Sequence, residues 1–389
     1  MIWVFDKDLH KIGIIDNYTS LIWARRYKEV GDFEIYLPAS VEILNLCKIG
    51  NYVEKDGSPM ICRIDSVSLS QKPEEGYYIT VTGKSAEALL DQRIIMETSI
   101  CNGSAEEFAL KLISSALGAD ASPERKIVDS DGILIFTMIQ NGFPETLKEQ
   151  VTYKNLGEKI REYCQSYGWG YKIEREQTYF VFSFYKGEDR SDSVVFSPNF
   201  ENVSTSEYSR DASDIQNFVL CAGEGEGDAR IKETVGTATG ANRYEVFADC
   251  KQLSKTIRFS EIVSAYPNGT ISQSGEKYYY SVSGVIIAEV PSASPSGNDE
   301  CKLTDAIYSE QLIARGEETI ANKGEIVTFD STIIPNVTFI FGEDYFLGDI
   351  VRIENEFGIS ANARIIEIVE VEDENGYSID PKFEYIEVE

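Results

Sequence analysis

Histidine is almost absent from this chain of 389 residues, which contains only His10. Ser–His and Cys–His nucleophile pairs need a histidine, and so do most zinc sites. His10 lies in a polar stretch between two short apolar runs, a pattern that predicts an exposed turn residue. We find no catalytic constellation and expect no catalytic, cofactor-binding or metal-binding residue. The sequence points to a protein that binds or assembles, and we expect no enzyme.

Basic residues are scarce, since the chain has 36 Lys and Arg but 65 Asp and Glu, which gives a formal net charge of −29. Such a surface repels phosphate and anionic membranes, so we expect no stable nucleic-acid binding. Residues 323–389 carry 16 acids against four bases, so a partner covering them should be basic. A signal peptide and any apolar run near the ~18 residues of a membrane helix are lacking, so we expect no membrane anchor.

Cysteine pairs at metal or redox spacing are also lacking. Seven cysteines are spread singly, with no C-x-x-C motif, which argues against a zinc ribbon or a redox motif. Several lie within apolar runs and are predicted to be small buried residues, as is usual in a reducing compartment. Their positions are 47, 62, 101, 164, 221, 250 and 301.

Alternating apolar residues dominate residues 1–98. The stretch Phe33–Leu37 alternates as a half-buried strand should, and Pro38 ends it. Residues 40–47 are predicted to form a short helix. Residues 200–235 return to strands, chiefly 215–222.

Residues 99–199 differ, because they contain two helical patterns. Ser104 and Glu107 form a capping box before an apolar stripe that ends at Gly118. A second helix is predicted from Asn155 to Gly168. Strands at 171–174 and 178–185 follow as a hairpin, so this stretch predicts a compact α+β unit.

The last third is predicted to be mostly strands. Within 236–322 we expect strands near 257–265 and 277–290, then a helix over 304–322 interrupted near Gly316. In residues 323–389 every predicted element is a strand. The expected strand ranges there are 326–330, 337–341, 349–354, 359–371 and 383–388.

Three local patterns have both a functional and a structural interpretation. The glycine run 223–227 contains two glutamates, so it favours a tight acidic turn over a phosphate cradle. Residues 373–376 lack the spacing of a calcium loop and favour an Asn-Gly hairpin turn. Tyr278–Tyr280 could stack on sugars, but alternation with Val282 favours a sheet face.

Several motifs, taken together in their order along the chain, resemble the siphovirus tail-hub family. This family is the N-terminal module of tail-associated proteins in phages of Gram-positive bacteria. The motifs that carry the resemblance are residues 18–23, Tyr27, 31–38, 217–220, 222–227, Arg230, 342–351 and 364–367.

The resemblance implies a β-rich α+β fold like that of a baseplate hub, with two tube-like β-barrel domains interleaved with smaller α+β domains. The first tube-like β domain would be 1–98, completed by 200–235, with 99–199 an inserted α+β domain. A second β-rich tube-like domain with a helix would span 236–322, and a C-terminal β domain 323–389. No catalytic residue of the family maps onto this chain.

The function implied is that of a structural baseplate or tail-tip hub of a phage or phage-like tail. A homotrimer would form a ring that adapts the six-fold tail tube to the three-fold tip. Expected partners are distal tail and tail-tube proteins, the tape-measure C-terminus, and spike or fibre proteins. Expected locations are the virion tail tip and, during assembly, the host cytoplasm. The alternatives are a peptidoglycan-degrading tail enzyme with paired carboxylates, and a receptor- or carbohydrate-binding tail module.

Overall fold

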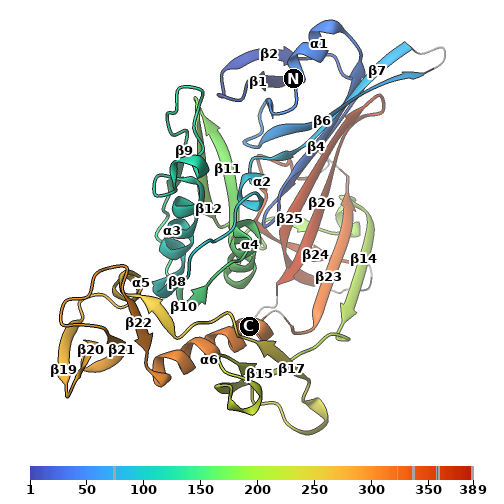
Figure 1. Cartoon of the computed structure of the whole chain (residues 1–389). Coiled ribbons are helices and arrows are strands. Elements are labelled where there is room, and N and C mark those ends of the chain that lie inside the picture. Colours follow the sequence, from blue (N-terminus) through green and yellow to red (C-terminus); the bar gives the residue numbers. More distant parts are fainter. Residues whose placement is uncertain (73–75, 322, 335–337, 356, 358–359, 387–389) are drawn as a thin grey trace.

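The computed structural model describes residues 1–72, 76–321, 323–334, 338–355, 357 and 360–386. Figure 1 shows three regions: a broad sheet, a helix-containing unit beside it, and a smaller unit of short strands below. The broad sheet contains both the first and the last strands of the chain. Among the described residues, no helix is long and apolar enough to cross a membrane.

The broad sheet has 13 strands, which run β14-β23-β26-β25-β3-β4-β7-β6-β5-β1-β2 with β13 and β24 attached to the side of β25. Its elements are β1 (Ile2–Phe5), β2 (Lys11–Ile15), β3 (Ser20–Arg26), β4 (Asp32–Pro38), β5 (Tyr52–Lys55), β6 (Ile61–Lys72), β7 (Gly76–Ser85), β13 (Val195–Phe196), β14 (Val203–Asp211), β23 (Ile326–Ile333), β24 (Ile350–Glu354), β25 (Ser360–Asp373) and β26 (Gly376–Ile386). The short helix α1 (Val41–Leu46) lies where the sequence predicts it.

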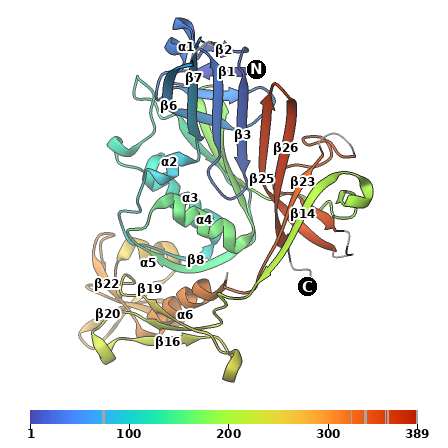
Figure 2. The ribbon, with the colours of Figure 1, turned by 90° about the vertical axis from the view of Figure 1, so that its right-hand side faces the viewer.

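Pairing between β3 and β25 joins the two ends of the chain, and Figure 2 shows these strands side by side. The antiparallel register places Trp23 opposite Glu370. Strand β14 likewise pairs with β23. Strand pairing therefore crosses the sequence ranges expected for separate domains, and those ranges stay a prediction.

The alternation predicted in β4 is confirmed. Phe33, Ile35 and Leu37 are at most 2 % exposed and face one core, while Glu34 is exposed. Trp23 packs against Phe33 in the same core, with ring centroids 5.7 Å apart. Successive side chains of a strand point to opposite faces, so one face of the sheet is buried.

The two helices and the hairpin predicted within residues 99–199 are confirmed, while the bounds of the α+β domain stay a prediction. The elements of this α+β unit are β8 (Ser99–Ser104), α3 (Ala105–Leu117), β9 (Phe136–Ile139), β10 (Thr146–Val151), α4 (Leu156–Tyr167), β11 (Gly170–Glu176) and β12 (Tyr179–Tyr185), preceded by α2 (Ala88–Asp91). Side chains start both long helices, because Ser104 and Asn155 accept hydrogen bonds from the main-chain N–H of Glu107 and Glu158. Gly168 ends α4 with a φ of 65°, in the left-handed region.

The lower unit consists of two small sheets and two helices. Its elements are β15 (Phe218–Ala222), β16 (Lys232–Val235), β17 (Glu245–Asp249), β18 (Thr256–Arg258), α5 (Phe259–Ala265), β19 (Thr270–Ser274), β20 (Lys277–Val282), β21 (Val285–Val290), β22 (Glu300–Leu303) and α6 (Asp305–Ala321). Strands β15–β17 form one sheet and β18–β22 the other.

Three sequence predictions need correction. Residues 259–265 form helix α5 and not a strand, because Ile262 and Ala265 lie on one face at helical spacing and are buried. Helix α6 continues through Gly316, where a Cβ would lie 2.7 Å from Val235 and 3.0 Å from the Cys221 sulfur. The glycine therefore allows close packing against β15 and β16. The predicted strand 337–341 is wrong for residues 338–341, and residue 337 lies outside the described residues.

The fold class is confirmed as β-rich α+β. Among the described residues none of the sheets closes on itself, since β14 and β2 end the broad sheet. The two tube-like barrels therefore stay a prediction.

Candidate functional site

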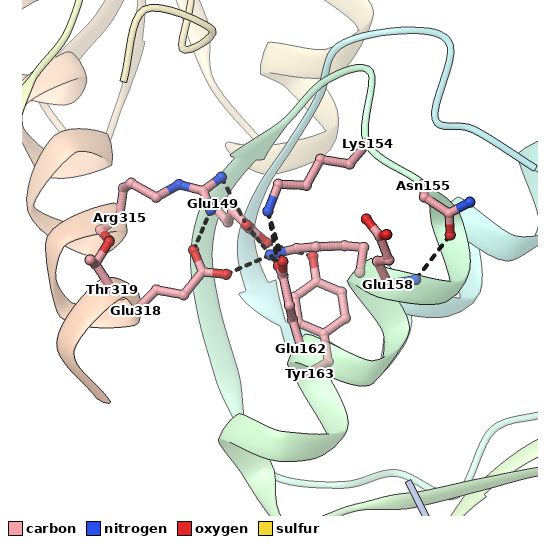
Figure 3. Close-up of polar contacts among 10 residues, drawn as sticks. Glu149, Lys154, Asn155, Glu158, Glu162, Tyr163, Arg315, Glu318 and Thr319 are labelled. Carbon is pink, nitrogen blue, oxygen red and sulfur yellow. Dashed lines mark hydrogen bonds and ion pairs between the residues drawn. The ribbon is translucent and has the colours of Figure 1, made fainter. Parts of the chain in front are cut away.

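A cluster of charged side chains, buried at its centre and partly exposed at its edge, lies where the α+β unit meets the lower unit. It is built from β10, α4 and α6, and Figure 3 shows Arg315 and Glu318 of α6 facing Glu149 and Glu162. Lys159 is fully buried at the centre. The cluster links segments separated by more than 150 residues, so only the folded chain assembles it.

Lys159 forms ion pairs with three carboxylates. Its Nζ lies 2.9 Å from Glu162 and 2.7 Å from Glu318, and it also pairs with Glu149. Arg315 adds ion pairs to Glu149 at 3.6 Å and to Glu318 at 2.7 Å. With Lys154, which lies 2.8 Å from Glu162, three cations balance three carboxylates. The low dielectric of this region makes such balance necessary, because an unpaired buried charge is costly.

Burial and ion pairing shift the pKa values of these groups in different directions. Burial alone would lower the pKa of Lys159, but Glu149, Glu318 and Glu162 outweigh it and raise the pKa. Burial raises the pKa of Glu149 despite the attraction of Lys159. For Glu162 burial is outweighed by Lys159 and Lys154, which lower its pKa to about 2. Lys159 and Glu162 are therefore charged at neutral pH.

Tyr163 completes the cluster by donating a hydrogen bond of 2.5 Å from its hydroxyl to Glu149. Burial raises the pKa of Tyr163 well above its usual range, so the hydroxyl keeps its proton. Catalysis by paired carboxylates requires one acid and one free base beside the substrate. Here Glu149, Glu162 and Glu318 all bind one ammonium group, an arrangement that serves to join elements.

A cavity of about 810 Å³ lies beside this cluster, between β10, α4 and α6. A second cavity, of about 690 Å³, lies between the broad sheet and the α+β unit. In its wall Arg25 pairs with Glu370, and Arg190 with Asp349.

His10 occupies the turn between β1 and β2, with a side chain that is 66 % exposed, as predicted. The carboxylate of Asp6 accepts hydrogen bonds from the main-chain N–H of Asp8 and His10 and so holds this turn together. Asp6, Asp8 and His10 have potential ligand atoms within 4.8 Å of one another. The turn alone accounts for this grouping.

The three local patterns that had both a functional and a structural interpretation, at 223–227, 373–376 and 278–280, form the predicted turns and strand. The glycine run follows core strand β15 as a turn, in which Gly225 has a φ of 111°. Residues 373–376 form the turn of the β25–β26 hairpin, where Asp373 pairs with Gly376. Tyr278–Tyr280 lie in β20, and Tyr280 is buried. All seven cysteines are free and buried, whereas burial was predicted for several of them.

Sequence reasoning missed the charged cluster entirely. One signal was available: Lys159 lies one residue before Ile160 and four before Tyr163, inside the apolar stripe of α4. A lysine on a core-facing stripe requires carboxylate partners. The sequence does not indicate that these partners come from β10 and α6.

Comparison with solved structures shows the fold of phage tail proteins. A tail protein from Neisseria meningitidis MC58 matches with a TM-score of 0.53 at 11% identity, over 98% of this chain and 95% of that one. The 43 kDa tail protein of prophage MuSo2 from Shewanella oneidensis matches with a TM-score of 0.55 at 12% identity, over 98% and 97%. No curated protein sequence matches the chain.

The family follows from the sequence itself. A family model described as "Siphovirus ReqiPepy6 Gp37-like protein" matches residues 1–383. The chain belongs to this siphovirus family, and the resemblance found in its motifs is confirmed.

Proposed function

We propose that this protein is the structural baseplate or tail-tip hub of a phage or phage-like tail and acts as a homotrimer. The observation that carries the proposal is the fold shared over 98% of the chain with two phage tail proteins. Membership of a siphovirus family points the same way. Three copies would form a ring that adapts the six-fold tail tube to the three-fold tip.

The role is mechanical, and it requires a rigid protomer. Pairing of β3 with β25 and of β14 with β23 ties distant parts of the chain into one sheet. The charged cluster joins the α+β unit to α6. A stable ring needs large symmetric interfaces, of at least about 1,000 Å² each.

The partners follow from position in the tail and from charge. The proposed partners are distal tail and tail-tube proteins, the tape-measure C-terminus, and spike or fibre proteins. A partner of the acidic C-terminal stretch 323–389 should be basic. The net charge of −29 suits a channel through which DNA slides without binding. The proposed location is the virion tail tip, after assembly in the host cytoplasm.

The two alternative functions have weaker support. A peptidoglycan hydrolase needs a free, accessible carboxylate pair, whereas the carboxylates of the charged cluster are all bound to Lys159. Activity on purified cell wall, lost when single Asp or Glu residues are changed, would favour the hydrolase. Binding of glycans or host cells would favour the receptor-binding module.

Native mass spectrometry with negative-stain imaging tests the proposal. The full chain, alone or mixed with the tube and distal tail proteins of the same tail, should give three times the 43.6 kDa of one chain and a three-fold annulus. The mixture is included because a ring can require its neighbour to assemble. A chain that stays monomeric in both samples contradicts the proposal.

A further inference from the structure

Three exposed apolar side chains lie on a short stretch of main-chain pairing that joins residues 94–96 to 153–155. Ile94 bridges Asn155 in antiparallel register, and the N–H of Tyr153 donates to the carbonyl of Ile95. This register places Met96 opposite Tyr153. Ile94, Met96 and Tyr153 are 47 %, 52 % and 75 % exposed. Clustered apolar side chains in solvent, unlike single ones, mark interaction surfaces.

Tyr153 also has a backbone conformation that a tyrosine rarely adopts. Its φ is 53°, in the left-handed region, where a bulky side chain is strained. Strained residues of this kind cluster at sites with a role in binding or catalysis. Because the side chain is mostly exposed, packing within one chain does not explain why a tyrosine occupies this position.

Two arginines beside this stretch lack carboxylate partners. Arg93 donates to the carbonyl of Arg125 at 3.2 Å, and Arg125 donates to the carbonyl of Ile94 at 2.8 Å. Neither forms an ion pair with any described residue, and Glu124 instead accepts a hydrogen bond of 2.5 Å from Ser122. Burial, and then the charge of Arg125, lower the pKa of Arg93, so repulsion outweighs attraction at this group.

These five residues form one surface, which we call the basic–apolar patch: Arg93, Ile94, Met96, Arg125 and Tyr153. Its charge decides which symmetry a contact between copies can have. A two-fold contact joins the same surface of both copies, so it would bring the arginines together. A head-to-tail contact joins two different surfaces and can close into a ring, so the patch favours this kind of contact with an acidic surface.

The turn of the β25–β26 hairpin supplies an acidic surface on the same chain. Asp373, Glu374 and Asp380 are exposed and form no ion pair among the described residues. They belong to residues 323–389, which carry 16 acids against four bases. Figure 2 shows this hairpin well apart from α2, which directly precedes Arg93 in the chain. One copy can therefore present the two surfaces to two different neighbours.

We propose that the basic–apolar patch of one copy binds the acidic β25–β26 turn of a second copy, head to tail. Arg93 and Arg125 pair with the carboxylates of the turn, while Met96 and Tyr153 cover the apolar part of the contact. The inference rests on the proposed homotrimer and names the two surfaces that the ring joins.

Photo-crosslinking of the full chain locates the contact. Benzoylphenylalanine is placed at position 153, and the chain is irradiated alone and mixed with the tube and distal tail proteins. Mass spectrometry of the digest should find position 153 linked to residues 360–386 of another copy. The same group at position 179, where the native tyrosine is also exposed, is the matched control and should give no such link.

Charge exchange tests the pairing of the two surfaces. Arg93→Glu combined with Arg125→Glu should raise the dissociation constant of the assembly by at least about tenfold. Adding Glu374→Lys and Asp380→Lys to the same chain restores opposite charges, so most of the affinity should return. Lys251→Glu, which changes an exposed lysine of the lower unit, is the matched control and should change the dissociation constant little.

Tyr153→Gly separates binding from folding. Glycine adopts positive φ readily, so the melting temperature should stay within about 2 °C of the original. The dissociation constant should nevertheless rise by about tenfold, because the largest exposed side chain of the patch is lost. Gln177→Gly, on an exposed turn with a φ of 55°, is the control and should change neither quantity.

The outcomes separate this contact from the proposed ring. A three-fold ring that tolerates the arginine reversal, or that forms without the expected crosslink, overturns this inference only. So does a loss of affinity that the lysine substitutions fail to restore. The expected crosslink in an assembly of another stoichiometry supports the contact and contradicts the three-fold ring only. A chain that stays monomeric in both samples, without crosslinks, contradicts both.

Discussion

The α+β unit contacts its two neighbours through joints of opposite character. Towards the broad sheet the contact is apolar, since Phe5, Tyr52 and Ile61 share one core with the helices and strands of the unit. Tyr52 and Phe180 meet there with ring centroids 5.3 Å apart. Towards the lower unit, Ile100 packs into the neighbouring core, but the centre of the contact is the ion cluster around Lys159.

The two contacts differ in what they contribute: the apolar contact stabilises the attachment of the unit, and the ionic contact fixes its orientation. Apolar burial contributes roughly 25 cal/mol per Å² and imposes little direction. Burying ions costs desolvation energy, which is recovered only when every partner is in place. The apolar joint therefore holds the unit to the sheet, while the ionic joint sets the orientation of α6 against α4.

The largest effect is expected from Lys159→Met. The change leaves Glu149, Glu162 and Glu318 close together with one fewer buried cation, so unfolding should become about 3–5 kcal/mol easier. Urea unfolding of the purified chain measures this. Lys154→Met, at the partly exposed edge of the cluster, is the matched control and should cost less than about 1 kcal/mol.

A second substitution sharpens the interpretation. Adding Glu149→Gln to Lys159→Met restores the balance of charge, so part of the loss should be recovered, with a coupling of about 0.5–3 kcal/mol. Strictly additive losses would show that packing, and not charge balance, governs this joint.

Ile61→Ala tests the apolar joint and should cost about 3 kcal/mol, within the 2–5 kcal/mol typical of buried isoleucine. Ile61 is fully buried, whereas Ile12 is 43 % exposed. The control substitution Ile12→Ala should therefore lower the free energy of unfolding by less than about 0.5 kcal/mol. Urea unfolding at low and high salt measures both. A loss that changes with salt would contradict the assignment of this joint as apolar.

The smallest effect is expected from the pH dependence of Glu162. Its pKa in the folded chain, about 2, lies below the ordinary value near 4.5, so its stabilisation is complete above pH 4.5. That stabilisation is lost as the pH falls towards 2. The side chain is 38 % exposed, so solvent screening reduces the effect to about 1 kcal/mol.

Glu149 acts in the opposite direction, because its raised pKa means that protonation favours the folded state. The measurement is therefore a difference between Glu162→Gln and the unmodified chain over acid pH. The variant should lose stability less steeply, and Glu158→Gln on the same helix is the control. Identical slopes in all three proteins would refute the assignment.

Local chemistry explains which elements could be predicted. Ser104, Asn155 and Gly168 mark helix ends because a side chain or a left-handed residue must satisfy free main-chain groups. Helix α5 was missed because its seven residues are too short for periodicity to separate a helix from a strand. The interruption predicted at Gly316 was wrong because this glycine is needed for close packing of the helix against Val235 and Cys221, which are distant in sequence.

The sequence by itself determined the helices of the α+β unit, the hairpin turns, the buried cysteines, the acidic surface and the family. These depend on nearest neighbours along the chain or on composition. Only the tertiary structure decided that β3 pairs with β25 and that Lys159 meets Glu149 and Glu318. The physical reason is that strand edges and charges accept many partners, and the choice is made when the whole core packs.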